Sequence, residues 1–226
     1  TSSTASLTIR GDDLEYNDLA FGFSNSLEST GGMVMESHSS SFSSAFDYEN
    51  FNLDPSVSSV RIGKTTNTAN VVIKEPVAMA GPISIYGGDI LLEEDLTSTQ
   101  SGADVLVKGR GDVEAVASRS FLTNNGDIVF WSNSDNSGVG SIKLGNDNVL
   151  NSSNGRSGDT DSGGGKITLG GGSGYGTSPT GYSSSSTGAG IKLGTSTANH
   201  TEIYSGGGDI SICLLYTSPS PRDRIR

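Results

Sequence analysis

The chain has 226 residues, of which 32 are glycine, and a formal net charge of −11. Only 32% of the residues are hydrophobic, and no stretch is apolar for the roughly 18 residues that a membrane-spanning helix needs. One cysteine and two histidines exclude a disulfide framework and a Cys- or His-rich metal site, and the acidic charge argues against nucleic acid as a partner. Two classes remain, a disordered chain and a thin β structure with many turns.

Residues 1–56 form the less regular part of the chain. Alternating apolar residues predict short strands at Leu7 to Ile9 and at Met33 to Glu36, separated by serine-rich turns. A group of aromatic residues follows, and we expect it to cover the edge of a β layer. Its members are Phe42, Phe46, Tyr48 and Phe51. This segment is therefore predicted to contain irregular leading coils.

Residues 57–212 repeat two short phrases. The first is an apolar-x-apolar-Gly unit, found at 60–63, 142–145, 167–170 and 191–194. The second is Gly-Asp followed by Ile or Val, found at 88–90, 111–113, 126–128 and 208–210. The first apolar residues after these turns recur on average about every 20 residues, which is typical of one coil of a solenoid.

Each repeat alternates apolar and polar residues, as a strand with one buried face does. We expect the inward pairs to be Ile83 and Ile85, Ile90 and Leu92, Val105 and Val107, Val113 and Ala115, Ile128 and Phe130, Ile142 and Leu144, Ile167 and Leu169, Ile191 and Leu193, and Ile210 and Ile212. Because the same phrases recur in the same direction, the pattern favours an all-β fold, a parallel β-helix (β-solenoid) with irregular coils of about 20 residues. An antiparallel sandwich and a disordered chain are the alternatives.

Residues 171–190 consist almost entirely of Gly, Ser, Thr and Tyr. Such a low-complexity stretch between two strand patterns predicts a long outward loop.

Three segments resemble the repeats of filamentous-haemagglutinin-like bacterial exoproteins. They lie at 60–71, 80–90 and 123–132, and the resemblance extends over about residues 30–212. It implies a right-handed β-helix, export through outer-membrane secretion machinery, an extracellular or cell-surface location, and adhesion to a host or neighbouring cell surface, including its glycans. The function expected from it is that of an internal fragment of a large adhesin, acting as a stalk or an adhesive surface.

Residues 213–226 differ abruptly from the rest, with two prolines and three arginines and no glycine. Cys213 to Asp223 resembles one reading frame of a transposase adapter used in sequencing libraries. We therefore expect residues 213–226 to be a non-native, disordered tail.

Two Arg-Gly-Asp triplets are candidate receptor-binding sites, because integrin-type receptors bind this sequence on exposed turns. They are Arg10-Gly11-Asp12 and Arg110-Gly111-Asp112. We expect the Asp residues of the Gly-Asp phrases to occupy equivalent turns, where stacked carboxylates would be candidate calcium ligands. These residues are Asp89, Asp112, Asp127 and Asp209. Solvated carboxylates that cap the turns are the simpler interpretation.

Tyr86, Trp131 and Tyr204 are expected to point outward, where their rings could stack on sugars. A glycan-binding module is therefore one alternative function, and a polysaccharide-acting β-helix enzyme is another. The one mixed charged group suited to catalysis is Arg156 with Asp159 and Asp161, in a Gly/Ser segment without apolar shielding. We accordingly expect neither enzymatic activity nor a cofactor.

Overall fold

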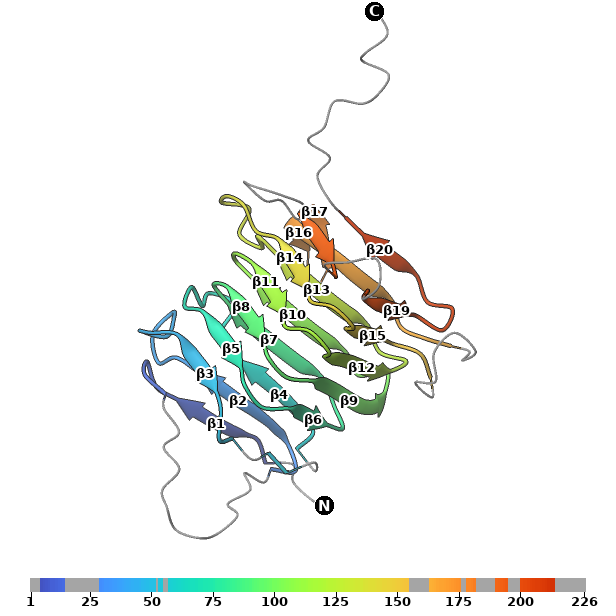
Figure 1. Ribbon diagram of the computed structural model, residues 1–226. Helices are drawn as coiled ribbons and strands as arrows, with labels where there is room; N and C mark the ends of the chain where they lie inside the picture. Colours follow the sequence, from blue (N-terminus) through green and yellow to red (C-terminus); the bar gives the residue numbers. More distant parts are fainter. Residues whose placement is uncertain are drawn as a thin grey trace, which may run out of the picture.

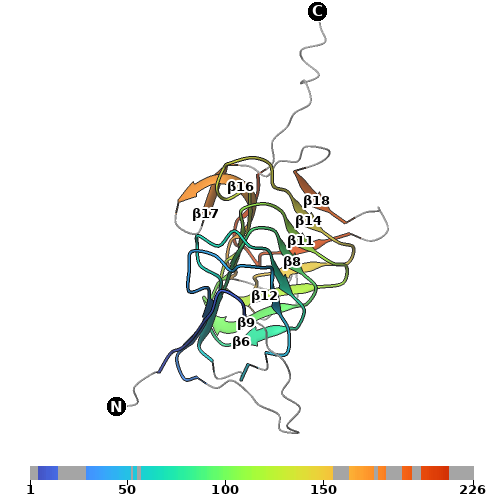
Figure 2. The same cartoon turned by 90° about the vertical axis from the view of Figure 1, so that its left-hand side faces the viewer.

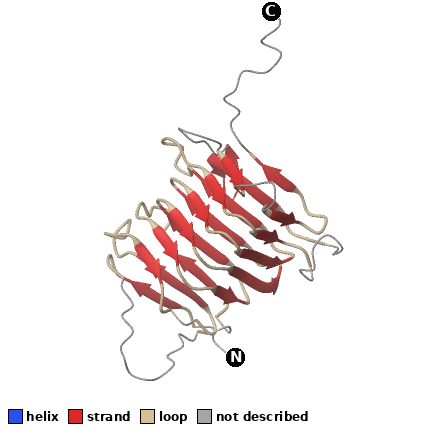
Figure 3. Cartoon of the chain, in the orientation of Figure 1, coloured by secondary structure: helices blue, strands red, loops and turns tan. Residues whose placement is uncertain are grey.

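The computed structural model describes residues 5–14, 29–51, 53–54, 57–154, 163–175, 178–181, 190–194 and 200–213. Within these ranges the chain is all-β, with strands joined by turns and without a helix (Figure 3). The described residues accordingly contain no helix that could cross a membrane. The strands lie in three sheets that run along one stack (Figure 1).

The first sheet contains β1 (Leu7–Arg10), β2 (Gly32–Glu36), β4 (Ser59–Ile62), β7 (Ile83–Gly87), β10 (Val105–Gly109), β13 (Ile128–Ser132), β16 (Ile167–Tyr175), β17 (Ser178–Gly181) and β20 (Ile210–Ile212). The second sheet contains β3 (Phe46–Tyr48), β5 (Val71–Ile73), β8 (Ile90–Leu92), β11 (Val113–Ala115), β14 (Ile142–Leu144) and β18 (Ile191–Leu193). The third sheet contains β6 (Val77–Met79), β9 (Leu96–Ser101), β12 (Ser120–Asn124), β15 (Val149–Asn151) and β19 (Glu202–Tyr204).

The coils from β4 to β19 each contribute one strand to each sheet, apart from the added hairpin strand β17, and strands of successive coils pair in parallel. Seen after a quarter turn, the chain winds repeatedly around one interior (Figure 2). The one antiparallel pair among the described strands is the β16–β17 hairpin. This arrangement is that of a β-solenoid, as the repeats predict.

The coils differ in length although their register is regular. Val60 pairs with Ile83, Ile83 with Val105 and Val105 with Ile128, at nearly even intervals along the chain. Ile128 pairs with Ile167, so the coil between these two partners is much longer than those before it. The sequence phrases that were averaged lie in both the first and the second sheet. Their mean spacing is therefore not the length of one coil.

The core consists of inward side chains that stack in register from coil to coil. Of the predicted inward pairs, those from Ile83 to Leu169 are buried, and Ile191 is 9% exposed. Ile210 and Ile212 pair with β16 but, contrary to the expected inward position, are 48% and 41% exposed. Their strand lies on the last described coil, where no further described strand covers them.

The described part of residues 1–56 belongs to the same stack. β1 and β2 pair in parallel and join the first sheet, and β3 joins the second sheet. The four aromatic residues are buried beside them; Phe42 stacks on Phe46 with ring centroids 4.9 Å apart, and Tyr48 stacks on Phe51 at 5.3 Å. They extend the core into the leading coils.

Glycine occurs at the turns because successive coils touch through their backbones there. A Cβ atom at Gly81 would overlap the carbonyl oxygen of Ser58, and one at Gly126 would overlap that of Ala103. The same holds for Gly111, whose Cβ would overlap the Asp89 carboxylate of the preceding coil. Close packing, rather than an unusual backbone conformation, therefore explains the Gly of the Gly-Asp phrase.

Part of the Gly/Ser segment is a hairpin rather than a loop. Residues 171–175 extend β16, and 178–181 form β17, which pairs back on it. A Cβ at Gly170 would lie 2.9 Å from the Pro179 side chain, so the absence of a side chain permits close packing of the two strands. Residues 182–189 and 214–226 lie outside the described part of the chain.

Candidate functional site

Polar side chains link successive coils at the turn that leads into the second sheet, which we call the second-sheet corner. The Asn70 Oδ1 atom accepts the backbone N–H of Asp89 at 2.9 Å. The Asp89 Oδ1 atom accepts the N–H of Asp112 at 2.9 Å, and the Asp112 Oδ1 atom accepts the N–H of Ser141 at 2.7 Å. Each side chain thus satisfies a backbone donor of the next coil.

A second ladder of the same kind lies at the turn that leads into the first sheet, the first-sheet corner. Asp104 Oδ1 accepts the N–H of Asp127 at 2.8 Å, and Asp127 Oδ1 accepts the N–H of Lys166 at 2.7 Å. Asp209 continues this column one coil later, where its backbone carbonyl accepts the N–H of Ile167. Burial raises the pKa of Asp104.

The four Asp residues of the Gly-Asp phrases therefore do not share one turn position. Asp89 and Asp112 lie at the second-sheet corner, whereas Asp127 and Asp209 lie at the first-sheet corner. The same phrase arises at both corners because each needs a small residue followed by an acceptor. Among the described residues, no group of three or more His, Cys, Asp or Glu side chains is placed to hold a metal ion.

Lys143 joins the second-sheet corner to the outer face of β11 and β14. Its ammonium group lies 2.7 Å from Asp112 Oδ2 and also contacts the Glu114 carboxylate. These two carboxylates raise the pKa of Lys143. Burial alone would raise the pKa of Asp112, but the hydrogen bonds from Lys143 and Ser141 outweigh it and lower that pKa.

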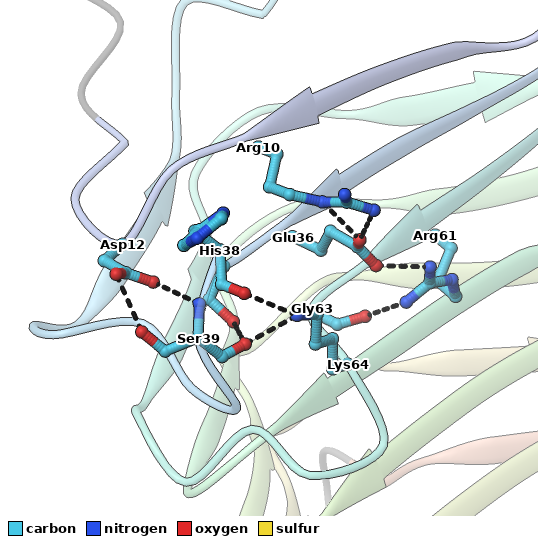
Figure 4. A network of polar contacts seen from close by, with 9 residues as sticks. Arg10, Asp12, Glu36, His38, Ser39, Arg61, Gly63 and Lys64 are labelled. Atoms are coloured by element: carbon cyan, nitrogen blue, oxygen red, sulfur yellow. Dashed lines mark hydrogen bonds and ion pairs between the residues drawn. The ribbon is translucent and has the colours of Figure 1, made fainter.

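The first Arg-Gly-Asp triplet is engaged within the stack (Figure 4). The Arg10 Nε atom donates to Glu36 Oε1 at 2.8 Å. Asp12 accepts the backbone N–H and the hydroxyl of Ser39, both at 2.7 Å, and these hydrogen bonds lower its pKa. Both charged ends of the triplet thus bind the next coil.

Glu36 is the centre of this network. Its side chain is 6% exposed, and it accepts hydrogen bonds from Arg10 on β1 and, at 2.7 Å, from Arg61 on β4. The hydrogen bonds from Arg61 and Arg10 lower the pKa of Glu36. A single carboxylate therefore links three successive strands of the first sheet.

The second triplet is engaged in the same way. Arg110 forms an ion pair with Asp135 at 3.1 Å, and Asp112 is held by Ser141 and Lys143. Receptor binding through either triplet would have to compete with these contacts.

Trp131 does not point into solvent, contrary to the sequence prediction. It is 1% exposed, forms a second apolar cluster with Leu106 and Val129 on the outer face of the first sheet, and donates its Nε1–H to the Gly172 carbonyl of β16 at 2.8 Å. The Lys108 ammonium group lies 3.5 Å from its ring centroid. The extended end of β16 thus covers a ring that a sugar would need to reach.

Tyr86 packs partly against this outer cluster, and Tyr204 is half-buried with its hydroxyl 2.9 Å from Glu202. The two tyrosines therefore lie on different sheets and do not form a common platform. Arg156, Asp159 and Asp161 lie outside the described residues.

A surface groove beside the second-sheet corner is the candidate binding site. It has a volume of about 280 Å³ and crosses β5, β8 and β11. Val72 and Leu91 face into it from strands whose other apolar residues are buried, and Asp89, Asp112 and Glu114 line its side. The sequence contains an indication of this groove, because two strands depart from strict alternation of apolar and polar residues. Three consecutive apolar residues occur at 71–73 and at 90–92, so at least one apolar residue of each strand must face outward, and in the structure it is the middle one.

A second hollow continues from this groove. It has a volume of about 310 Å³ and shares Asn70 with the groove. Small and polar residues line most of it, Thr68 and Ala69 from the same coil as Asn70 and Ser43 and Ser44 from the preceding coil. The two hollows follow the same corner over four coils.

Comparison with family models, curated proteins and solved structures finds no match to this chain. Its function is therefore inferred from the solenoid and its corners.

Proposed function

We propose that this chain is a segment of an exported bacterial adhesin of the filamentous-haemagglutinin-like type. Its coils act as a stalk or an adhesive surface at the cell exterior and carry out no chemistry of their own. In this proposal the coils are right-handed, and the secretion machinery of the outer membrane exports the chain. A parallel solenoid supports the proposal, because stacked coils extend a chain steadily in one direction.

The observation that supports the stalk function is that the carboxylates at the corners bind the next coil. Asp89, Asp112 and Asp127 each accept a backbone N–H of the following coil, so that their charges hold the stack together. Glu36 links three strands of the first sheet through hydrogen bonds that it accepts from the Arg10 and Arg61 side chains. Polar groups engaged in this way resist sliding of one coil over the next.

Attachment and catalysis are tested on the same protein. Beads coated with the chain are added to cultured epithelial cells and to immobilised glycans, with beads coated with an unrelated acidic protein as the control. A stalk predicts no attachment above that control. Attachment that disappears in Asp112→Glu would instead assign the second triplet to a receptor.

The polysaccharide-acting alternative makes a different prediction. Incubation with a panel of acidic polysaccharides is expected to release no new reducing ends above a heat-denatured sample. Release that persists through repeated purification would contradict the proposal.

Antibodies against the chain are expected to label intact cells of the source bacterium, and labelling confined to permeabilised cells would contradict the surface location.

A further inference from the structure

The groove over β5, β8 and β11 joins an aliphatic floor to an acidic rim. We propose that it binds an extended, cationic peptide segment of a partner protein, whose lysine or arginine side chains lie across the floor and reach the rim. This binding function goes beyond the stalk, and its loss would leave the stack intact.

The floor consists of Val72 and Leu91. The two residues pair in register on neighbouring coils, and both are only half-buried although β5 and β8 lie in the middle of the second sheet. Lysine and arginine bury their aliphatic stems on such surfaces while their charged ends remain in water. The floor therefore matches the stem of a cationic side chain.

The rim supplies the complementary charge. Asp89, Asp112 and Glu114 line the groove, and Lys143 contacts two of them. Three carboxylates against one ammonium group leave a local excess of negative charge. Asp89 and Asp112 are also oriented by the hydrogen bonds that they accept from the next coil, so the rim is formed before a ligand arrives.

The direction of the groove favours an elongated ligand. Val72, Leu91 and Glu114 hold the same position on three successive coils, and adjacent strands lie about 4.8 Å apart. Beyond Asn70 the hollow continues past Ser43, Ser44 and Thr68. Their hydroxyls donate within the stack, and their oxygens can still accept an N–H of a peptide backbone. Among the described residues, those that line the groove itself include no aromatic ring on which a sugar could stack.

The test uses a fluorescein-labelled hexapeptide of alternating lysine and valine or serine, Lys-Val-Lys-Ser-Lys-Val, and fluorescence anisotropy at low salt. The double variant Asp89→Asn/Glu114→Gln removes two rim charges. Asparagine keeps an oxygen for the Asp112 N–H, as Asn70 does one coil earlier. Each exposed ion pair contributes modestly to the binding free energy, and the loss of two of them should weaken binding by about tenfold.

Asp104→Asn/Asp127→Asn is the matched control, because it also removes two carboxylates, from the same kind of ladder at the other corner. It should change the affinity by less than about twofold, since these charges are remote and screened. Leu91→Thr tests the floor, keeps a strand-forming residue, and should weaken binding about three- to fivefold. Circular dichroism confirms that each variant is folded.

Three results would overturn the proposal. Equal weakening by Asp104→Asn/Asp127→Asn would show attraction to the acidic protein as a whole. Full competition by spermine, together with an unchanged affinity of Leu91→Thr, would assign the groove to a small polyamine. Self-association of the wild-type chain that is lost in Asp89→Asn/Glu114→Gln would assign it to a second copy.

Discussion

Asp112 provides the sharpest test of how the corner ladders stabilise the fold. Its carboxylate accepts the N–H of Ser141 at 2.7 Å and the Ser141 hydroxyl at 3.0 Å, and its second oxygen pairs with Lys143. Ser141 is 1% exposed, so water cannot replace the lost acceptor. Asp112→Ala therefore leaves a buried backbone donor without a partner.

The magnitude follows from these contacts. A hydrogen bond to a charged acceptor contributes about 1.5–3 kcal/mol, and the half-exposed ion pair with Lys143 adds at most about 1 kcal/mol. We expect Asp112→Ala to lower the free energy of unfolding by about 3 kcal/mol. Asp112→Asn keeps the acceptor for Ser141 and should cost about 1 kcal/mol, mainly through the ion pair.

Urea unfolding monitored by circular dichroism measures the difference between the two variants. It should be about 2 kcal/mol at equal denaturant slopes, which indicate that both variants expose similar surface on unfolding. Equal midpoints for Asp112→Ala and Asp112→Asn would refute the reasoning, because the ladder hydrogen bond would then contribute nothing.

Three further predictions concern other parts of the stack. Glu36→Gln should cost about 2 kcal/mol in urea unfolding, since Arg10 and Arg61 lose their shared carboxylate. Folding lowers the pKa of Glu36, so its carboxylate contributes fully to the free energy of unfolding above the unfolded pKa of about 4.3. That contribution is lost as the pH falls through the lowered pKa of the folded state. The wild type should therefore lose more stability than Glu36→Gln between pH 6 and pH 3. Trp131→Ala should cost about 3 kcal/mol and speed hydrogen exchange in β16 and β17; unchanged exchange would show that the ring does not hold the hairpin. Gly81→Ala should lower the melting temperature by several degrees, whereas Gly138→Ala, at a site with open space around it, should leave it within about 2 degrees.

Local alternation predicted the strands well because the inward stripe requires it. Ile83 and Ile85, or Val105 and Val107, can only face the same side of a strand, and the buried side follows from their polarity. The assignment of repeats to sheets was not predictable in this way. Gly126-Asp127 and Gly111-Asp112 look alike in sequence but belong to different corners, because both corners impose the same close packing and the same unpaired donors.

The outer surface was harder to predict than the core. Trp131 has the position of an outward residue, and it is buried only because β16 continues beyond its neighbours and offers the Gly172 carbonyl. The groove was missed for the opposite reason. Val72 and Leu91 look like part of a fully apolar strand, and their outward position emerges only once the register is fixed.

The uneven coil lengths have a consequence for how positions on the surface are related. Val60, Ile83, Val105 and Ile128 follow one another at nearly even intervals and Ile167 comes after a much longer one, yet each step is one strand. Extra residues lengthen the perimeter of a coil and leave its rise along the molecular axis unchanged. Distance along the molecular axis is therefore counted in whole strands of about 4.8 Å, and insertions at a turn can be gained or lost without changing the spacing of groups above and below them.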